Sequence, residues 1–249
     1  MLPPKFQDVV TLLRTYLGKR PRRGPFPLES AFTWSTLLSC QSASGLRGDM
    51  LEIGVEFGTS GFLMLESLAL DEQATFIDIV ATEEWRAGMA GPYSDKTNVQ
   101  FITGNSLQMN VADMPPQCRW IHIDGGHLYQ HVANDLALTA DSLAEGGVIV
   151  LDDFFEIRWP DVTAAILQFL KEDSRLTPFL LVNRKLYCTG HPEQALAYQA
   201  MFADFLESNR SLIGDPRWWL EVEMLGQQVM VAKLALGQEL SGLETDQQV

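Results

Sequence analysis

The chain of 249 residues is 46% hydrophobic and 20% charged, which is enough apolar material for the core of one large domain and excludes a disordered or collagen-like protein. Its 32 acidic residues outnumber 18 basic residues, so the formal net charge is -14. This charge repels polyanions and therefore argues against nucleic acid as a partner.

The first predicted element is an amphipathic helix within an opening helical segment, which we place at residues 1–47. Apolar residues recur at helical spacing from Phe6 to Leu17, and the pattern stops at Gly18. Residues 1–24 contain six basic side chains and only one acidic side chain. Two interpretations remain open: a helix packed on the main domain, which we favour, and a membrane-surface anchor or organellar presequence.

Short apolar runs then alternate with helical patterns between residues 48 and 190. The runs cover residues 50–53, 75–80, 99–103, 119–123 and 147–151, with helices expected at 61–70 and 128–143. Apolar strands separated by helices indicate a mostly parallel sheet with helices on both faces, which is a doubly wound α/β fold. Such folds bind ligands beyond the carboxyl ends of the strands, so the residues after each run are the candidate site.

The part of the chain after residue 151 begins with a predicted helix at 160–170. Two strands at 179–182 and 185–188 follow, joined by a turn at Asn183 and Arg184. We then expect a helix at 193–207 and a hairpin around Gly226 in a C-terminal part that covers residues 191–236, and a disordered tail at 237–249. The segment 220–236 is a candidate edge for contact between subunits, which leaves a homo-oligomer open.

The three cysteines, Cys40, Cys118 and Cys188, lie far apart in the sequence and form no CxxC pair. The sequence therefore predicts neither a disulfide framework nor a zinc ribbon. No apolar run reaches the roughly 20 residues of a membrane span, and the start has no signal-peptide core. We expect a soluble, cytoplasmic protein without a transmembrane segment.

The first strand of the α/β region runs into a glycine-rich turn, GVEFGTSG, from Gly54 to Gly61. Glycines let a ligand approach the backbone closely, and free N–H groups at the start of the next helix attract a carboxylate or a phosphate. The spacing differs from the GxGxxG of dinucleotide-binding proteins, and no Lys or Arg stands nearby to receive a pyrophosphate. The turn favours a nucleotide-like ligand other than NAD, with a plain tight turn as the alternative.

Polar residues also follow the second and third strands. Asp78 ends the second strand, where a carboxylate can accept hydrogen bonds from both ribose hydroxyls, although a loop residue or a helix cap is an equal alternative. Asn105 and Ser106 follow the third strand, where a small polar turn can border an adenine ring. Together the three turns predict a ligand that contains adenosine.

The strongest local signal is the sequence IHIDGGH followed, after one helix, by GGVIVLDD. It places Asp124, Asp152 and Asp153 at the ends of two neighbouring strands, with His127 three residues after the first acid. Because closely packed carboxylates repel one another, we expect a bound cation, and oxygen ligands favour magnesium, manganese or calcium over zinc. Alternatively, one acid caps a helix or only terminates its strand. His127 and His131, four residues apart on one predicted helix face, are a weaker zinc candidate.

With these motifs the chain resembles the class I S-adenosylmethionine-dependent methyltransferases, which implies their Rossmann-like fold. LEIGVEFGTS resembles their first motif and FIDI their second. IHIDGGHLYQHVANDL and LAEGGVIVLDDFF resemble the metal-dependent O-methyltransferase branch, which is similar to the macrocin type and more distantly to the catechol type. The resemblance covers residues 48–187.

The resemblance implies a role for each motif residue. His127 stands where the macrocin type has its histidine base. A divalent cation, which we expect to be Mg²⁺, would be held by Asp124, Asp152 and Asp153. The residues implied in binding S-adenosylmethionine are Glu52, Gly54, Gly58 and Ser60 on the methionine side, Asp78 at the ribose, Asn105 and Ser106 at the adenine, and Asp124.

These implications predict an enzyme that transfers a methyl group from S-adenosylmethionine to a hydroxyl of a small molecule, such as a sugar, a glycosylated metabolite or another natural product. The enzyme would align the hydroxyl with the donor, lower its pKa with the cation and remove its proton with His127. The alternatives are a dinucleotide-dependent oxidoreductase and a non-catalytic partner module that binds the cofactor. The loops that set the acceptor contain generic residues, so the sequence does not identify the acceptor.

Overall fold

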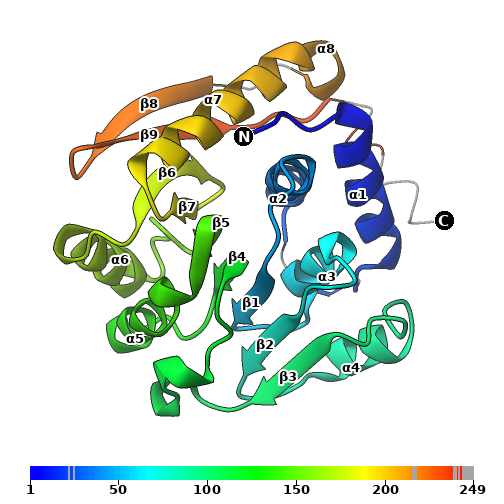
Figure 1. The fold of residues 1–249 in the computed structure, drawn as a ribbon, viewed down its shortest axis with the longest axis vertical. Helices are drawn as coiled ribbons and strands as arrows, with labels where there is room; N and C mark the ends of the chain where they lie inside the picture. The colour runs from blue at the N-terminus through cyan, green and yellow to red at the C-terminus, as the bar shows by residue number, and fades with distance from the viewer. Residues whose placement is uncertain (22, 25, 215–217, 238–239, 241, 243–249) are drawn as a thin grey trace.

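The computed structural model describes all residues except 22, 25, 215–217, 238–239, 241 and 243–249. The described part forms one nine-stranded sheet with helices on both faces (Figure 1). The strands are β1 (Asp49–Ile53), β2 (Ala74–Asp78), β3 (Val99–Thr103), β4 (Cys118–Ile123), β5 (Leu143–Leu151), β6 (Thr177–Val182), β7 (Lys185–Thr189), β8 (Trp218–Met224) and β9 (Gln227–Lys233). The α-helices are α1 (Phe6–Lys19), α2 (Leu28–Ala43), α3 (Thr59–Ser67), α4 (Glu83–Ala90), α5 (Tyr129–Thr139), α6 (Pro160–Glu172), α7 (Pro192–Ser208) and α8 (Arg210–Ile213), with short 3-10 turns η1 (Ser106–Gln108), η2 (Val111–Asp113) and η3 (Ala140–Ser142).

The strand order is β3-β2-β1-β4-β5-β7-β6-β9-β8. Pairing is parallel from β3 through β5, as the sequence predicts, and β7 then adds antiparallel to β5. The chain proceeds outward from β1 to β3 and then returns to place β4 on the other side of β1. The order of the strands therefore reverses between β1 and β4, which is where doubly wound sheets bind their ligands.

Apolar side chains of the central strands point alternately to the two faces of the sheet. Met50 belongs to a core formed with α1, α2, α3, α4 and α7, whereas its neighbour Leu51 belongs to a second core formed with α5 and α6. Trp120 and Ile121 divide between the two cores in the same way. Successive side chains of a strand point to opposite faces of the sheet, and both faces are buried here. This explains why these strands appear in the sequence as continuous apolar runs.

Helix α2 is an element that the sequence patterns do not predict individually. Twelve of its sixteen residues are buried, so apolar and small polar side chains occur all round it. A helix without a solvent-facing side shows no alternation of apolar and polar residues at a period of 3.6. Helix α1 does show that period, and it packs its apolar face on α2 and α3, as the packed-helix interpretation expects.

Two hairpins occupy the positions at which the sequence predicts them. Asn183 and Arg184 turn β6 into β7 with φ values of 49° and 63°, which is typical of a two-residue turn of type I′. The other hairpin joins β8 and β9 through Leu225 and Gly226. Because β9 pairs in parallel with β6, this hairpin extends the same sheet. Most of the predicted tail, 238–239, 241 and 243–249, lies outside the described residues.

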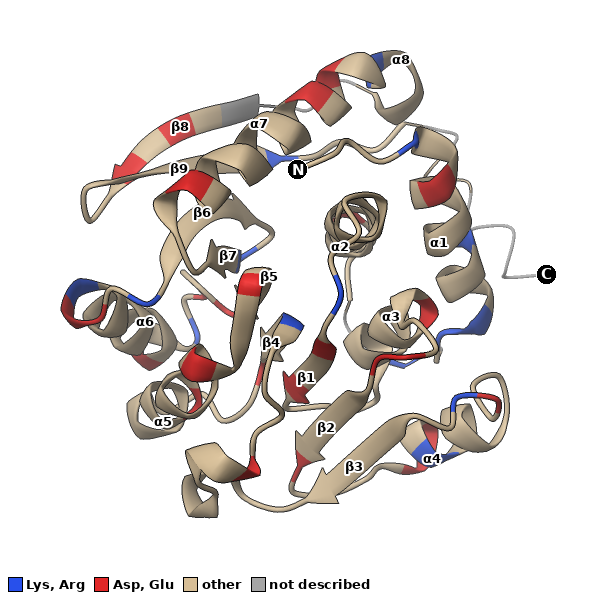
Figure 2. Cartoon of the chain, in the orientation of Figure 1, with Lys and Arg blue, Asp and Glu red and all other residues tan. Residues whose placement is uncertain are grey.

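Acidic positions occur on the sheet, the helices and the loops, as Figure 2 shows, so the negative charge is spread over the fold. Two basic residues at and just after the end of α1 pair with acidic residues on neighbouring helices. Lys19 lies 2.8 Å from Glu66 on α3, and Arg23 lies 3.2 Å from Glu84 on α4. No helix in the described part of the chain has the length and hydropathy needed to cross a membrane.

Candidate active site

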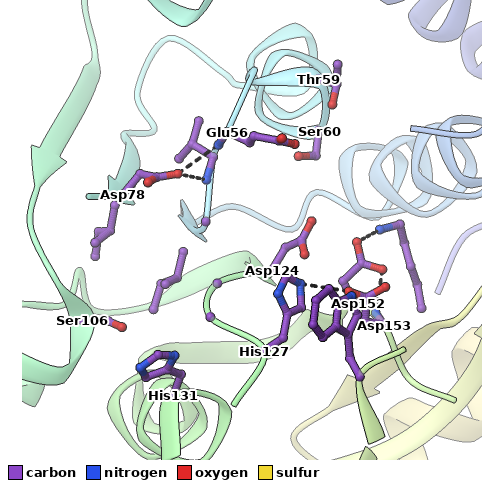
Figure 3. Close-up of a pocket in the computed structure, with 18 of the residues that line it drawn as sticks. Glu56, Thr59, Ser60, Asp78, Ser106, Asp124, His127, His131, Asp152 and Asp153 are labelled. Carbon is purple, nitrogen blue, oxygen red and sulfur yellow. Dashed lines mark hydrogen bonds and ion pairs between the residues drawn. The ribbon is translucent and has the colours of Figure 1, made fainter. Parts of the chain in front are cut away.

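A cavity of about 810 Å³ lies at the carboxyl ends of the parallel strands, where the strand order reverses. Its wall is completed by Phe26 and Pro27, just before α2, and by the turn between β6 and β7. Figure 3 shows acidic and imidazole side chains from several strand ends around one space. The predicted site residues that line the cavity are Gly54, Ser60, Asp78, Asn105, Ser106, Asp124, His127, Asp152 and Asp153.

The turn between β1 and α3 brings the backbone close to the cavity. Gly54 has a φ of 88°, and a Cβ atom there would lie 2.0 Å from the carbonyl oxygen of Asp124. Both the left-handed conformation and the close approach of the two chain segments require glycine. The ends of β1 and β4 can therefore meet at the floor of the cavity.

Two of the residues predicted to bind the cofactor lie behind the cavity wall. Glu52 is fully buried, and its Oε1 accepts a hydrogen bond from the Ser60 hydroxyl and lies 2.7 Å from Nδ1 of His122. A Cβ atom on Gly58 would lie 2.6 Å from Trp85 and 2.9 Å from Phe62. Glu52 therefore acts on the cavity through Ser60, while Gly58 permits the packing of α3 on α4.

Asp78 fixes the same turn from the end of β2. Its Oδ2 accepts hydrogen bonds from the backbone N–H groups of Val55, at 2.7 Å, and Glu56, at 2.9 Å. Among the residues that the structure describes, the only donor to its Oδ1 is the Val80 N–H, at a long distance of 3.4 Å. One carboxylate oxygen therefore holds the turn, while the other retains capacity to accept a hydrogen bond from a ligand.

Asn105 and Ser106 lie beside Asp78 at the end of β3. The Asn105 side chain caps η1 by accepting a hydrogen bond of 3.0 Å from the Leu107 N–H. The carbonyl oxygen of Ser106 accepts a hydrogen bond of 3.0 Å from the side chain of Asn134 on α5. These bonds fix a polar turn on the cavity wall, which is also lined by the apolar Ile77 and Ile79.

The three aspartates predicted to bind a metal meet at the ends of β4 and β5. Ligand atoms of Asp124, Asp152 and His122 lie within 4.8 Å of one another, and so do those of Asp124, Asp153 and His127. Burial and the negative charge of Asp152 raise the pKa of Asp124 well above its usual range. Burial also opposes ionisation of Asp152, but Lys185 and His122 together outweigh it and hold the pKa of Asp152 well below its usual range.

Lys185 is a site residue that the sequence interpretation missed. Its side chain is buried, pairs with Asp152 and places its Nζ 5.4 Å from the centre of the Phe26 ring. The sequence signal is a lone charged residue at the start of an apolar strand, directly after a predicted turn. Its significance depends on the antiparallel pairing of β7 with β5, which no local pattern reveals.

His127 projects from the loop between β4 and α5. Its Nε2 lies 3.0 Å from Oδ2 of Asp153, and its ring stacks on Trp159 with centroids 4.5 Å apart and planes inclined by 14°. Because α5 begins at Tyr129, His127 precedes the helix. The prediction that His127 and His131 share one helix face is therefore wrong, and the zinc alternative loses its geometric basis. His131 lines the cavity separately, beneath Gly126.

Comparisons with known proteins agree with this geometry. Residues 51–154 match the family model described as a methyltransferase domain. The fold is similar to that of the O-methyltransferase NovP, at 16% identity and a TM-score of 0.58, over 73% of this chain and 97% of that chain. It is also similar to cofactor-bound Rv0187 from MTB, at 17% identity and a TM-score of 0.53, over 75% of this chain and 90% of that chain. No curated protein sequence gives a match.

A third similar structure is an O-methyltransferase from Bacillus cereus in complex with SAH, at 17% identity and a TM-score of 0.51, over 76% of this chain and 92% of that chain. The strand order and the cavity at its reversal point are those of the class I S-adenosylmethionine-dependent methyltransferase fold, and residues 51–154 match a methyltransferase domain. The fold class and the kind of enzyme that the sequence predicts are thereby confirmed.

Proposed function

We propose that the protein transfers a methyl group from S-adenosylmethionine to a hydroxyl of a small molecule with the assistance of a divalent cation. The observation that carries the proposal is that Asp124, Asp152, Asp153 and His127 converge in the same cavity that the Gly54 turn and Asp78 line. A donor site and an acid cluster in one cavity suit a transfer between two bound molecules.

The residues present fit the donor. Gly54, Val55 and Ser60 offer a close backbone and a hydroxyl without any cationic side chain, which suits a ligand that carries no phosphate. Asp78 retains an acceptor oxygen for a ribose hydroxyl, and Ile79 offers an apolar wall beside an adenine. We assign these residues to S-adenosylmethionine.

The residues also fit a divalent cation. Asp124, Asp152 and Asp153 carry three negative charges when ionised, and the Lys185 ammonium offsets one of them. The remaining charge of two matches Mg²⁺ or Mn²⁺, and carboxylate oxygens are the ligands that both prefer. When bound, the cation would lower the pKa of a coordinated hydroxyl and orient it.

The chain itself supplies the proton acceptor and its orientation. Asp153 accepts a hydrogen bond from Nε2–H of neutral His127, which leaves Nδ1 as the unprotonated nitrogen that can take a proton from the acceptor hydroxyl. Stacking on Trp159 restricts rotation of the imidazole ring. An imidazole can both accept and release a proton, so His127 is suited to act as the base.

The proposal is tested by incubating the protein with isotopically labelled S-adenosylmethionine, Mg²⁺ and a panel of phenolic and sugar hydroxyl compounds. We expect a labelled methyl ether in the mass spectrum of at least one compound. Absence of transfer to every compound, combined with tight calorimetric binding of NAD, would contradict the proposal in favour of a dinucleotide enzyme.

A further inference from the structure

The mouth of the cavity carries a pair of arginines that the proposed donor and metal sites do not use. Arg158 lies in the loop between β5 and α6, Arg184 lies in the turn between β6 and β7, and both line the cavity. About half or more of each side chain is exposed, at 67% and 52%. Both therefore remain accessible to a molecule that enters the cavity.

One buried acid holds both guanidinium groups in place. The Glu156 side chain is 4% exposed, its Oε1 accepts a hydrogen bond of 3.0 Å from Nε of Arg158, and its Oε2 pairs with a terminal nitrogen of Arg184. The loop is also fixed to the turn, because the Phe154 N–H donates a hydrogen bond of 2.8 Å to the Arg184 carbonyl. The two guanidinium groups are thus positioned before any ligand arrives.

This arrangement leaves cationic donors without an acidic partner. Within the described part of the chain, Glu156 is the only acid paired with Arg158 or Arg184, so one carboxylate serves two positive charges. Each guanidinium has five N–H donors in a planar fork that suits the two oxygens of a carboxylate or a phosphate. The two guanidinium groups and the Glu156 carboxylate together carry a net charge of +1, whereas the whole chain has a net charge of -14.

Exposed apolar side chains stand on both sides of these arginines. Trp159, which lines the cavity, is 38% exposed, and Phe155 at 59% and Ile157 at 92% precede it in the same loop; Tyr129 at the start of α5 is 42% exposed. The Tyr129 N–H donates to Asp161 on α6 at 3.4 Å, which brings the two segments together. An aromatic ring on the cavity wall, exposed apolar side chains next to it and two cationic donors suit a ligand with an apolar body and an anionic group.

We propose that the acceptor is an apolar hydroxy acid, whose anionic group is bound by Arg158 and Arg184 at the mouth while its hydroxyl reaches His127. This inference rests on the proposed function, because it identifies the acceptor of the same site. The two arginines are specificity residues that bind the acid, and Glu156 is the positioning residue that orients them. A neutral acceptor would leave the arginines in water and gain nothing from them.

The test compares two probes that share a ring and two hydroxyls but differ in charge, 3,4-dihydroxybenzoate and 3,4-dihydroxybenzyl alcohol. Their affinities are measured by calorimetry with the full chain, Mg²⁺ and S-adenosylhomocysteine, so that no turnover is needed. For the unmodified protein we expect the acid to bind about tenfold or more tightly than the alcohol, as charge-assisted hydrogen bonds predict.

In the double variant Arg158→Gln, Arg184→Gln we expect this preference to disappear while binding of the alcohol changes less than twofold. The matched control is Arg86→Gln, an exposed arginine on α4 that does not line the cavity, which should keep the preference. Should the double variant fail to fold, the single changes Arg158→Lys and Arg184→Lys keep the charge but remove the fork, and each should reduce the preference.

The proposal is overturned if the unmodified protein binds the acid no more tightly than the alcohol, if it binds neither, or if the double variant keeps the preference. Failure of the proposed function has a different signature. In that case the acid still binds preferentially and the arginine changes still abolish that preference, but no methyl group is transferred to either probe.

Discussion

His127 is the side chain on which the proposed proton transfer depends. We expect His127→Ala to lower kcat by about 10²- to 10⁴-fold, the usual range for loss of a general base, because the variant lacks the nitrogen assigned to accept the proton. Donor affinity, measured by calorimetry with S-adenosylmethionine, should stay unchanged, since His127 is assigned to the acceptor and is not among the predicted donor contacts.

The matched control is His191→Ala, which changes an exposed histidine that precedes α7 and lies outside the cavity wall. It should keep full activity. Unchanged turnover of His127→Ala would remove the imidazole from its assigned role, and loss of donor binding in that variant would indicate a structural effect instead.

The cavity-lining residues that directly follow strands could be predicted from the sequence. A parallel sheet brings the carboxyl ends of its strands to one edge, where these residues gather. The sequence did not predict Lys185, because the position of that residue depends on a β7–β5 pairing between distant segments. It also placed Glu52 and Gly58 at the donor, whereas both lie behind the wall. A glycine-rich motif identifies a turn but does not distinguish the residues that line a cavity from those that support its wall.

Among the elements, the start of α3 depends on Gly58 for its packing. A Cβ atom there would approach Trp85 to 2.6 Å, and the φ of 80° disfavours any side chain. We expect Gly58→Ala to lower the free energy of unfolding by about 2–4 kcal/mol, the sum of backbone strain and overpacking. Urea unfolding followed by circular dichroism measures the change.

Gly45 provides the matched control, because its φ is 72° but nothing lies within 4 Å of an added Cβ. Gly45→Ala should cost only the strain of the left-handed backbone, about 1 kcal/mol. Equal losses in the two variants would show that contact with Trp85 does not constrain Gly58.

A buried ion pair joins β4 to the helices of one face. Arg119 donates to both carboxylate oxygens of Glu72, at 2.7 and 2.8 Å, and also to Gln41 on α2 and to the carbonyl of Ser67 on α3. Removing one partner leaves a buried charge unpaired, so Glu72→Gln should lower the free energy of unfolding by about 3–5 kcal/mol at pH 7.

The pH dependence of this pair has a definite sign. Burial opposes ionisation of Glu72, but Arg119 and the backbone N–H groups of Ala69 and Gly48 together outweigh it and lower the pKa of Glu72 from 4.5. A carboxyl whose pKa is lower in the folded state adds stability above pH 4.5 and loses it as the pH falls through the folded value. The difference between the unmodified protein and Glu72→Gln should therefore shrink in urea titrations below pH 4.5 and stay constant above it. A difference that grows in acid would contradict this assignment.

Helices and strands could be predicted where burial produces a regular pattern of apolar residues along the sequence. The central strands are short and buried on both faces, so they appear as short apolar runs. Helix α1 has one solvent-facing side, so its apolar residues recur at helical spacing. Helix α2 is surrounded by protein and has no such side. The location of the C-terminal hairpin in the same sheet, through β9 and β6, follows from tertiary pairing alone.

In the molecule as a whole, acidic residues are spread over the fold, and a few of them gather in the cavity. The acids of β2, β4 and β5 meet where the strand order reverses, and the basic residues of two distant loops close the mouth. The carboxyl ends of one sheet therefore bring the residues proposed to bind the donor, the cation and the acceptor to a single cavity. The fold thus brings residues that are far apart in the sequence, such as Gly54 and Lys185, to the wall of one cavity.

The most direct test of the account is the metal dependence of methyl transfer, measured with labelled S-adenosylmethionine after treatment with a chelator and again after addition of Mg²⁺. The account predicts that the chelator abolishes transfer and Mg²⁺ restores it, and that Asp124→Asn and Asp153→Asn shift the Mg²⁺ concentration for half-maximal activity upward by tenfold or more, because each loses an anionic ligand. Full activity in the chelator, with the same rates in both variants, would contradict the assignment of these aspartates and the proposed mechanism.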